Sequence, residues 1–255
     1  MTETSSPTIG SVDRAAQVLH LFVQTDARTL GVTEIATALD LSKAVVHRVL
    51  TSLREAGFVD TDESSRRYRL GPASLALGVA YLDRLDLRDL ARPVLGSLSA
   101  GTHETATLSV RHGDSRTYVD QVAPLTEIRM TVPLGRLHPL HAGSSSKAFL
   151  AFLSESEQAD YLARELPQLT DLTVTDPALL ARELASVRKR GFARSLGERQ
   201  PGAASVAAPV FDHEGHPAGV ISICGPLERF RPRTDEAAVL LLEACRGLSR
   251  QLGFR

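Results

Sequence analysis

The sequence has little of several features that would point to whole classes of protein. Its 255 residues include only two cysteines, Cys224 and Cys245, which are far apart and form neither a C-x-x-C pair nor a zinc-binding spacing. Free thiols fit a reducing compartment. No apolar run approaches the ~20 residues that span a bilayer, and residues 1–10 lack the basic start and apolar centre of a secretory signal. We therefore expect a cytoplasmic protein without membrane contact, whose residues 1–10 form a disordered terminus.

Catalytic and cofactor-binding motifs are also missing. No G-x-S-x-G elbow occurs, and no nucleophile stands next to a base in a turn that would activate it. The phosphate-binding G-x-x-x-x-G-K and the dinucleotide-binding G-x-G-x-x-G are both absent. His138 and His141 flank a proline, but no cysteine or second histidine pair accompanies them. We expect no catalytic residue, cofactor or metal site; a hydrolase built on the serines and histidines of the second half is the alternative.

Positive charge is not in excess. The formal net charge is −1, and residues 1–71 hold eight basic and nine acidic residues. A nucleic-acid function must therefore depend on where the charges lie. This balance argues against a constitutive architectural DNA-binding protein, which would be more basic.

The first 71 residues have the pattern of a winged helix-turn-helix. Apolar residues at helical spacing predict helices over residues 11–25 and 33–40, and a third from the N-cap Ser42 to Gly57. A short turn joins the last two, the arrangement in which the later helix enters the major groove. Residues 58–70 then predict a β-hairpin with arginines on its return strand, which is typical of a wing.

The third helix and the wing supply the residues that we expect to face DNA. Cations reach guanine edges or phosphates, and a small apolar side chain meets a thymine methyl group. The candidates on the helix are Ser42, Lys43, Ala44, His47 and Arg48, and those on the wing are Arg66, Arg67 and Arg69. A winged helix that is purely structural or binds protein is the alternative that the pattern leaves open.

These segments resemble a known family. SVDRA at 11–15, TEIA at 33–36, LSKAVVHRVL at 41–50, GFV at 57–59 and YRLG at 68–71 resemble, in order and spacing, the N-terminal domain of the IclR family of bacterial regulators. PLHA at 139–142 with Lys147 and Ala148, AAPV at 207–210 and GVISI at 219–223 also resemble that family. The resemblance covers nearly the whole chain from Ser11 and implies a DNA-binding transcriptional regulator that senses a small molecule.

The rest of the chain predicts a linker and an α+β domain. Residues 72–100 are apolar and helical in pattern, and Pro93 predicts two helices with a break near Arg92. From Glu104 the period changes to two, which predicts hairpins over 105–122 and 206–224 and a strand over 128–132. Helices are expected over 147–153, after Ser154, and over 177–190 and 235–252. The resemblance implies that the first linker helix contributes to a dimer and that residues 101–255 form a GAF-like effector-binding domain.

The resemblance also implies an effector pocket. Its contacts map to Ser144, Ser145, Ser195, Ser205, Ser222 and Cys224. Ser144 and Ser145 precede a predicted helix, whose free backbone N–H groups and dipole favour an anion. Alternation places Ser222 and Cys224 on one face of a strand. Many members of the family carry acidic residues around positions 195–198, whereas here only Glu198 is acidic and Arg199 follows it. If the Arg199 side chain faces the pocket, it would pair with a carboxylate of the effector. We expect the effector to be a small organic or aromatic acid.

The expected mechanism is allosteric. A homodimer or a dimer of dimers would place paired third helices in successive major grooves of double-stranded operator DNA. A bound effector would favour one arrangement of the linker helices and so change operator affinity. Repression and activation, and dimer and tetramer, stay open as alternatives.

Overall fold

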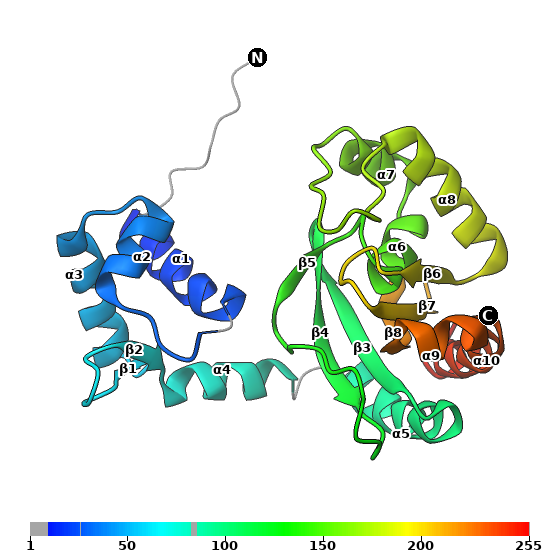
Figure 1. The fold of residues 1–255 in the computed structure, drawn as a ribbon, viewed down its shortest axis with the longest axis horizontal. Helices are drawn as coiled ribbons and strands as arrows, with labels where there is room; N and C mark the ends of the chain where they lie inside the picture. Colours follow the sequence, from blue (N-terminus) through cyan, green and yellow to red (C-terminus); the bar gives the residue numbers. More distant parts are fainter. Residues whose placement is uncertain (1–9, 26, 83–85, 255) are drawn as a thin grey trace. The chain divides into compact units, whose positions relative to one another are not determined.

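The computed structural model describes residues 10–25, 27–82 and 86–254, which fall into two compact units. The first unit comprises residues 1–84 and the second residues 85–255. The first is helical with a small hairpin, and the second is built on one large sheet (Figure 1). The chain is thus of the α+β class. None of its described helices combines the length and hydrophobicity that crossing a bilayer requires.

Three helices form the core of the first unit and confirm the predicted pattern. They are α1 (Gly10–Gln24), α2 (Val32–Leu39) and α3 (Lys43–Glu55). Asp40 ends α2 in the left-handed conformation, at φ 52°, and Ser42 begins α3 by accepting a hydrogen bond from the backbone N–H of the third helical residue. The apolar sides of the helices meet at fully buried side chains, namely Val18, Ile35, Val46 and Leu50.

The expected disordered terminus lies almost wholly outside the described residues. Residues 1–9 are not among those that the structure describes. Gly10, the last residue of the expected terminus, belongs instead to the first turn of α1.

The predicted wing is a short antiparallel hairpin of β1 (Val59–Thr61) and β2 (Tyr68–Leu70). The backbone of Tyr68 also exchanges two hydrogen bonds with Leu30, which ties the wing to the segment before α2. Between the strands, the carboxylate of Asp62 accepts bonds from the backbone and hydroxyl groups of Ser64 and Ser65. These bonds lower the pKa of Asp62 to about 2, so it stays ionised and holds the turn.

The helix after the wing, α4 (Pro72–Leu82), is apolar around most of its surface. Leu75, Leu77 and Val79 leave 70%, 60% and 45% of their surface exposed within the chain. Because helices that are apolar all round are normally covered, α4 is a candidate for burial against another molecule.

The second unit contains a six-stranded antiparallel sheet in the order β5-β4-β3-β8-β7-β6. The two predicted hairpins are confirmed, as β3 (Thr105–His112) with β4 (Ser115–Val122) and β7 (Ala203–Phe211) with β8 (Pro217–Pro226). They join through β3 and β8 in the middle of the sheet. The two edge strands are short and were not predicted; they are β5 (Leu137–Pro139) and β6 (Ala193–Leu196).

Helices cover both faces of the sheet. On one side α5 (Asp86–Thr102) packs beside α10 (Thr234–Gln251), and on the other α6 (Ser144–Ala151) packs against α8 (Pro177–Arg190) (Figure 1). The remaining elements are α7 (Glu155–Leu162), which Ser154 caps as predicted, α9 (Leu227–Phe230) and a 3₁₀ turn at Arg231–Arg233. The α6 side has an apolar core of its own, which includes Leu140, Phe149, Leu180 and Ala207.

The two helices predicted over residues 72–100 are present as α4 and α5, but the predicted position of the break, near Arg92, is wrong. Pro93 lies inside α5, which continues to Thr102. Pro93 and Asp89, whose carbonyl loses its usual helical partner, are both on the exposed side, where water can replace the bond. The opposite side of α5 is buried and keeps its packing. The predicted linker of residues 72–100 therefore spans helices that belong to different units.

The predicted strand over residues 128–132 is also wrong, because side chains take the place of a backbone ladder there. The carbonyl of Met130 accepts a hydrogen bond from the Thr105 hydroxyl. The side chain of Gln121 bonds both the N–H and the C=O of Val132, at 3.0 and 2.9 Å. The segment is held against the sheet in this way without joining it.

Candidate functional sites

The first candidate site is the outer side of α3. Val46, Leu50 and Leu53 turn inward, so the other side of the helix faces solvent. All five helix residues predicted to face DNA are exposed, namely Ser42, Lys43, Ala44, His47 and Arg48. The Ser42 hydroxyl caps the helix. Among the residues that the structure describes, no side chain pairs with Lys43, His47 or Arg48, so these groups are available to an outside partner.

The arginines of the wing differ from one another. Arg66 sits at the exposed tip with φ 55°, and no ion pair joins it to any residue in the described ranges. Arg67 instead donates to both carboxylate oxygens of Glu34 on α2, at 3.0 and 2.6 Å, and to the side chain and backbone of Thr29. This arginine, predicted to grip DNA, is engaged within the chain.

Arg69 is also paired within the chain, to Asp60 on the opposite strand of the wing at 3.0 Å. Both side chains of that bridge are about half exposed. Exposed pairs of this kind are weak, so a phosphate can compete for Arg69 more easily than for Arg67.

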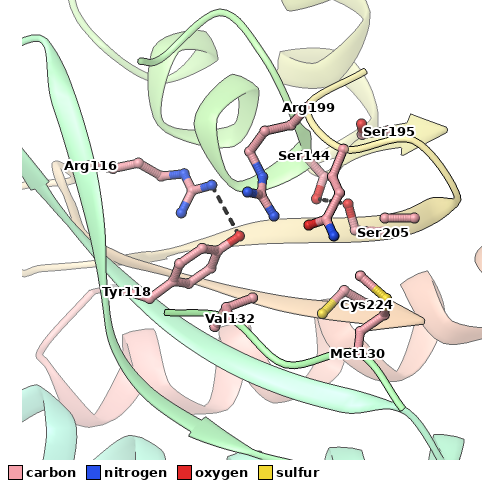
Figure 2. Close-up of a pocket in the computed structure, with 12 residues that line it drawn as sticks. Arg116, Tyr118, Met130, Val132, Ser144, Ser195, Arg199, Ser205 and Cys224 are labelled. Atoms are coloured by element: carbon pink, nitrogen blue, oxygen red, sulfur yellow. Dashed lines mark hydrogen bonds between the residues drawn. The ribbon is translucent and has the colours of Figure 1, made fainter. Parts of the chain in front are cut away.

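The second candidate site is a small cavity between the sheet, the start of α6 and the loop after β6 (Figure 2). Four of the six predicted effector contacts line it: Ser144, Ser195, Ser205 and Cys224. Ser145 and Ser222 are buried and do not line it; the Ser222 hydroxyl shares a hydrogen bond with Thr107. The free volume of the cavity is about 20 Å³, which is room for about one water molecule.

Two arginines reach into this cavity. Arg116 comes from β4 and Arg199 from the loop after β6, and both guanidinium groups lie near Tyr118 (Figure 2). Their Cζ atoms are 4.2 and 5.9 Å from the centre of that ring. Gly143, at φ +91°, lies under Arg199, and a Cβ added there would be 3.4 Å from the Cβ of Arg199. The sequence left open which way Arg199 points, and here it points inward.

Arg116 was missed by the sequence reasoning. It is 1% exposed and donates to the hydroxyls of Ser146, Ser109 and Tyr118, at 2.8, 3.2 and 3.0 Å. The available signal was alternation, because Arg116 and Tyr118 lie two apart on the strand that proves to be β4 and so share a face. A strand face that points inward seldom carries a charge unless a partner is close.

Two other titratable groups beside the cavity, His138 and Cys224, are neutral at physiological pH. Burial, together with the charges of Arg116 and Arg199, lowers the pKa of His138 to about 3. Burial raises the pKa of the Cys224 thiol to about 12. Among the described residues that line the cavity, the two guanidinium groups are therefore the charged ones.

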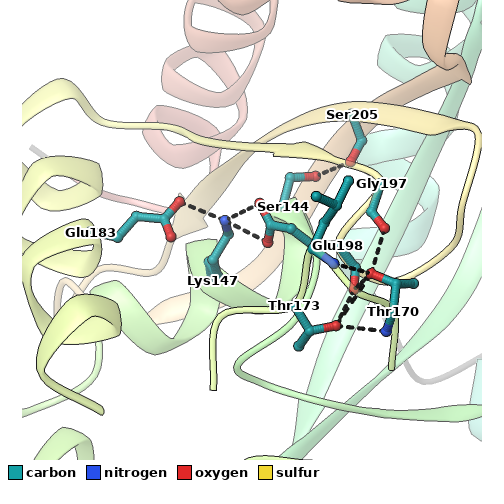
Figure 3. A network of polar contacts seen from close by, with 9 residues as sticks. Ser144, Lys147, Thr170, Thr173, Glu183, Gly197, Glu198 and Ser205 are labelled. Carbon is teal, nitrogen blue, oxygen red and sulfur yellow. Dashed lines mark hydrogen bonds and ion pairs between the residues drawn. The ribbon is translucent and has the colours of Figure 1, made fainter. Parts of the chain in front are cut away.

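A buried ion-pair network lies next to the cavity (Figure 3). The ammonium of Lys147, fully buried on α6, is 2.5 Å from Glu183 on α8 and 2.7 Å from Glu198. Burial raises the pKa of the Glu198 carboxyl, and Lys147 opposes that shift. The hydroxyls of Thr170 and Thr173 donate to backbone carbonyls of the same loop, at 2.8 and 2.7 Å. The network thus fixes the loop from which Arg199 extends.

Both units match models of one family. Residues 11–63 match the model described as the IclR helix-turn-helix domain, and residues 79–250 match the model described as the bacterial transcriptional regulator IclR C-terminal domain. The transcriptional regulator BhcR of Paracoccus denitrificans is 37% identical over 243 residues, which cover 94% of this chain and 86% of that protein.

Solved structures are similar over nearly the whole chain. An IclR transcriptional regulator from Alicyclobacillus acidocaldarius has a TM-score of 0.86 and 32% identity, covering 97% of this chain and 100% of that one. An IclR homologue from Microbacterium hydrocarbonoxydans, complexed with 4-hydroxybenzoate, has a TM-score of 0.79 and 23% identity, covering 95% and 98%. The second likeness is one of fold.

Proposed function

The chain belongs to the IclR family of bacterial transcriptional regulators, and on that basis we propose that it binds a specific operator with an affinity set by a small acid. It is a regulator rather than an enzyme, since its relatives are transcriptional regulators. Operator DNA lies in the bacterial cytoplasm, which is where this function would place the protein.

The observation that carries the proposal is the outer side of α3. Lys43, His47 and Arg48 are exposed on the helix that follows the turn, without partners in the described part of the chain. We propose that they read base edges or anchor phosphates, with Ser42 and Ala44 close to the bases. From the wing, the unpaired arginine at the tip is the residue best suited to reach the phosphate backbone.

The effector part of the proposal is supported by the cavity. It combines hydroxyl groups, the start of a helix and two cations, all of which favour an acid. The homologue of the same fold that is complexed with 4-hydroxybenzoate supports an acid as the class of effector. We propose that the acid is contacted by four residues that line the cavity, Ser144, Ser195, Ser205 and Cys224. Ser145 and Ser222 are buried outside the cavity and would hold the lining residues in position.

We also propose that the active form is a homodimer or a dimer of dimers. The exposed apolar side chains of α4 favour burial against a second copy. Two copies of α3 would then meet two half-sites of the operator.

Replacing Lys43 with alanine is expected to weaken operator binding about tenfold to a hundredfold, a loss of roughly 1–3 kcal/mol. The test is a mobility shift on the upstream intergenic DNA at fixed salt, with and without a panel of aromatic and aliphatic acids. Lys189→Ala is the matched control, because Lys189 is exposed on α8 in the other unit. Equal binding by the two variants would remove Lys43 from the interface. No specific shift in any condition would contradict the proposed function.

Arg67 is expected to act through the shape of the wing, so Glu34→Gln should weaken operator binding as Arg67→Met does. Both changes remove the ion pair that joins the wing to α2. Neither should change the slope of affinity against salt concentration, which depends on phosphate contacts. Arg66→Met is the contrasting variant, because losing one phosphate contact lowers that slope by about one. A lower slope for Arg67→Met with normal binding by Glu34→Gln would instead make Arg67 a phosphate contact.

A further inference from the structure

The effector cavity holds two positive charges without a negative one. Arg116 and Arg199 both line it, and within the described ranges neither has a carboxylate partner. The partners of Arg116 are three hydroxyl groups, which accept hydrogen bonds without balancing its charge. These bonds also use only part of the donors of a guanidinium group, so donors are left for a ligand.

The nearby acids are already engaged elsewhere. Glu104, close to Cys224, is 1% exposed and receives two hydrogen bonds from Arg229, each 2.8 Å long. Glu198 is paired with the buried Lys147. Turning either carboxylate toward the cavity would break an ion pair that is already formed, so these acids are not free to neutralise the two arginines.

Buried charges in proteins are normally paired, because an isolated charge in a low-dielectric interior is costly. Arg116 is buried, and Arg199 is half-buried beside it. The two guanidinium groups lie beside the same Tyr118 ring, which places them within roughly 10 Å of each other, and like charges at that range repel where water is scarce. A monoanion would balance one of them and leave the other uncompensated.

We propose that the effector is a small dianion whose two negative charges are bound by Arg116 and Arg199. This inference rests on the proposed function, since it names the class of effector that the same cavity takes. A dicarboxylate and a phosphate group both supply the second charge, and both suit the planar fork of an arginine.

The fold gives the dianion further contacts. The first N–H groups of α6, at Ser144, carry the positive end of the helix dipole beside Arg199. Met130 and Val132 form an apolar wall on the side nearer Cys224 (Figure 2). The charged part of the ligand therefore lies toward the arginines and the less polar part toward this wall.

Arg199 must also move to admit a ligand. The free volume of about 20 Å³ is too small for any organic acid, and the Arg199 side chain takes up part of the space. The backbone on its N-terminal side is fixed by Lys147 and the two threonine hydroxyls. The side chain of Arg199 can thus change rotamer while its backbone stays in place. After the anion has entered, the guanidinium group would return to contact it.

The test is a calorimetric titration of the full-length protein, free of DNA, with matched pairs of probes. The pairs are phthalate with benzoate, succinate with butyrate, and inorganic phosphate at pH 8 with the same ion at pH 6. Sulfate, a dianion at both pH values, controls for titration of the protein itself. We expect the more highly charged member of at least one pair to bind about tenfold tighter or better, the factor that one additional charge-assisted contact supplies. The carboxylate pairs and the phosphate pair separate the two sources of the second charge.

Arg199→Gln should reduce the preference for the dianion to about threefold or less, because it removes one charge-assisted contact. The variant should still fold, since Arg199 is partly exposed. Arg116→Lys keeps a buried charge and should shift the preference less than Arg199→Gln does. The matched control is Arg250→Gln, an exposed arginine on α10 outside the cavity, which should leave the preference unchanged.

Three results would overturn the inference: equal binding of monoanions and dianions, failure of every dianion to bind, and a preference that survives Arg199→Gln. None of them depends on DNA, so the proposed function is judged separately by the mobility shift. If a monocarboxylate changes the mobility shift of the operator, the proposed regulatory function stands and the proposal of a dianionic effector is wrong.

Discussion

Replacing Lys147 with methionine is expected to lower the free energy of unfolding of the second unit by about 3–5 kcal/mol, the usual cost of removing one partner from a buried ion pair. Lys147 is fully buried and balances both Glu183 and Glu198. Glu183 is 29% exposed and can turn to water, but Glu198 is 13% exposed and would remain buried without its counter-charge. Urea denaturation followed by circular dichroism measures the change.

The control is the double variant Lys147→Met with Glu198→Gln, which removes both charges. Replacing both partners of a buried pair is often close to neutral, so the double variant should recover most of the stability lost by the single one. If the double variant is as unstable as Lys147→Met alone, the loss comes from the shape of the side chain, and the charge argument is wrong.

The effect of Lys147→Met should also depend on pH. Burial raises the pKa of Glu198 above 4.5 and Lys147 counteracts this, so the variant raises that pKa further. A carboxyl with a raised folded-state pKa stabilises the fold below its unfolded pKa, and this stability is lost as the pH rises through the folded value. The penalty of Lys147→Met will therefore be smaller at pH 5 than at pH 8. The same penalty at both values would contradict the assignment of the lost stability to the Glu198 charge.

Most helices could be predicted because residues close to each helix end in the sequence determine where the helix begins or stops. Ser42, Ser154 and Asp176 each accept a backbone hydrogen bond at a helix start, and Pro177 occupies the first position of α8. The two main hairpins were equally clear, since their alternation and turns are local. These features need no information from distant parts of the chain.

The two wrong predictions, the strand over residues 128–132 and the helix break near Arg92, concern features that local sequence does not determine. The segment around Met130 has a strand-like composition, but Thr105 and Gln121 bond its backbone from other elements. The fit of Pro93 in α5 depends on which side of that helix faces solvent. Contacts between residues far apart in sequence decide both cases, and the pattern of a single segment does not contain them.

The candidate pocket was predicted in part. Its serines were identified because the family resemblance maps effector contacts onto them, whereas Arg116 was missed, since the hydroxyl groups of Ser146 and Ser109 that hold it inside the domain come from other elements. Arg199 was identified, but its direction depends on how Glu198 is held by Lys147. Gly143 completes the arrangement before α6, since its φ of +91° is one that a residue with a side chain rarely adopts. One short helix, α6, therefore supplies both Ser144, which lines the pocket, and Lys147, which holds the loop after β6 through Glu198.

Replacing Gly71 with alanine is expected to destabilise the first unit by about 1–3 kcal/mol, the usual cost of overpacking. A Cβ on Gly71 would lie 2.3 Å from the backbone oxygen of Gly57. That oxygen accepts the hydrogen bond from Ala73 that begins α4, and Gly71 itself donates to Phe58. The Cβ is fixed rigidly to its own backbone and the atom that it meets is a backbone oxygen, so the wing and the start of α4 would have to separate.

Gly96→Ala is the control for that variant. Gly96 lies within α5, and outside the backbone of its own helix no atom of the described chain is within 4 Å of the position of its Cβ. Alanine there should be neutral or stabilise the helix, since glycine costs roughly 1 kcal/mol relative to alanine inside a helix.

Hydrogen exchange measured by mass spectrometry locates the effect of Gly71→Ala within the chain. Exchange should become faster in β1, β2 and α3 and stay unchanged in the large sheet, because the clash lies in the first unit. Since α3 carries the DNA-facing residues, operator affinity should fall in Gly71→Ala and persist in Gly96→Ala. Unchanged exchange in the wing of Gly71→Ala would show that the backbone tolerates the added methyl group and that the fold does not require this close approach.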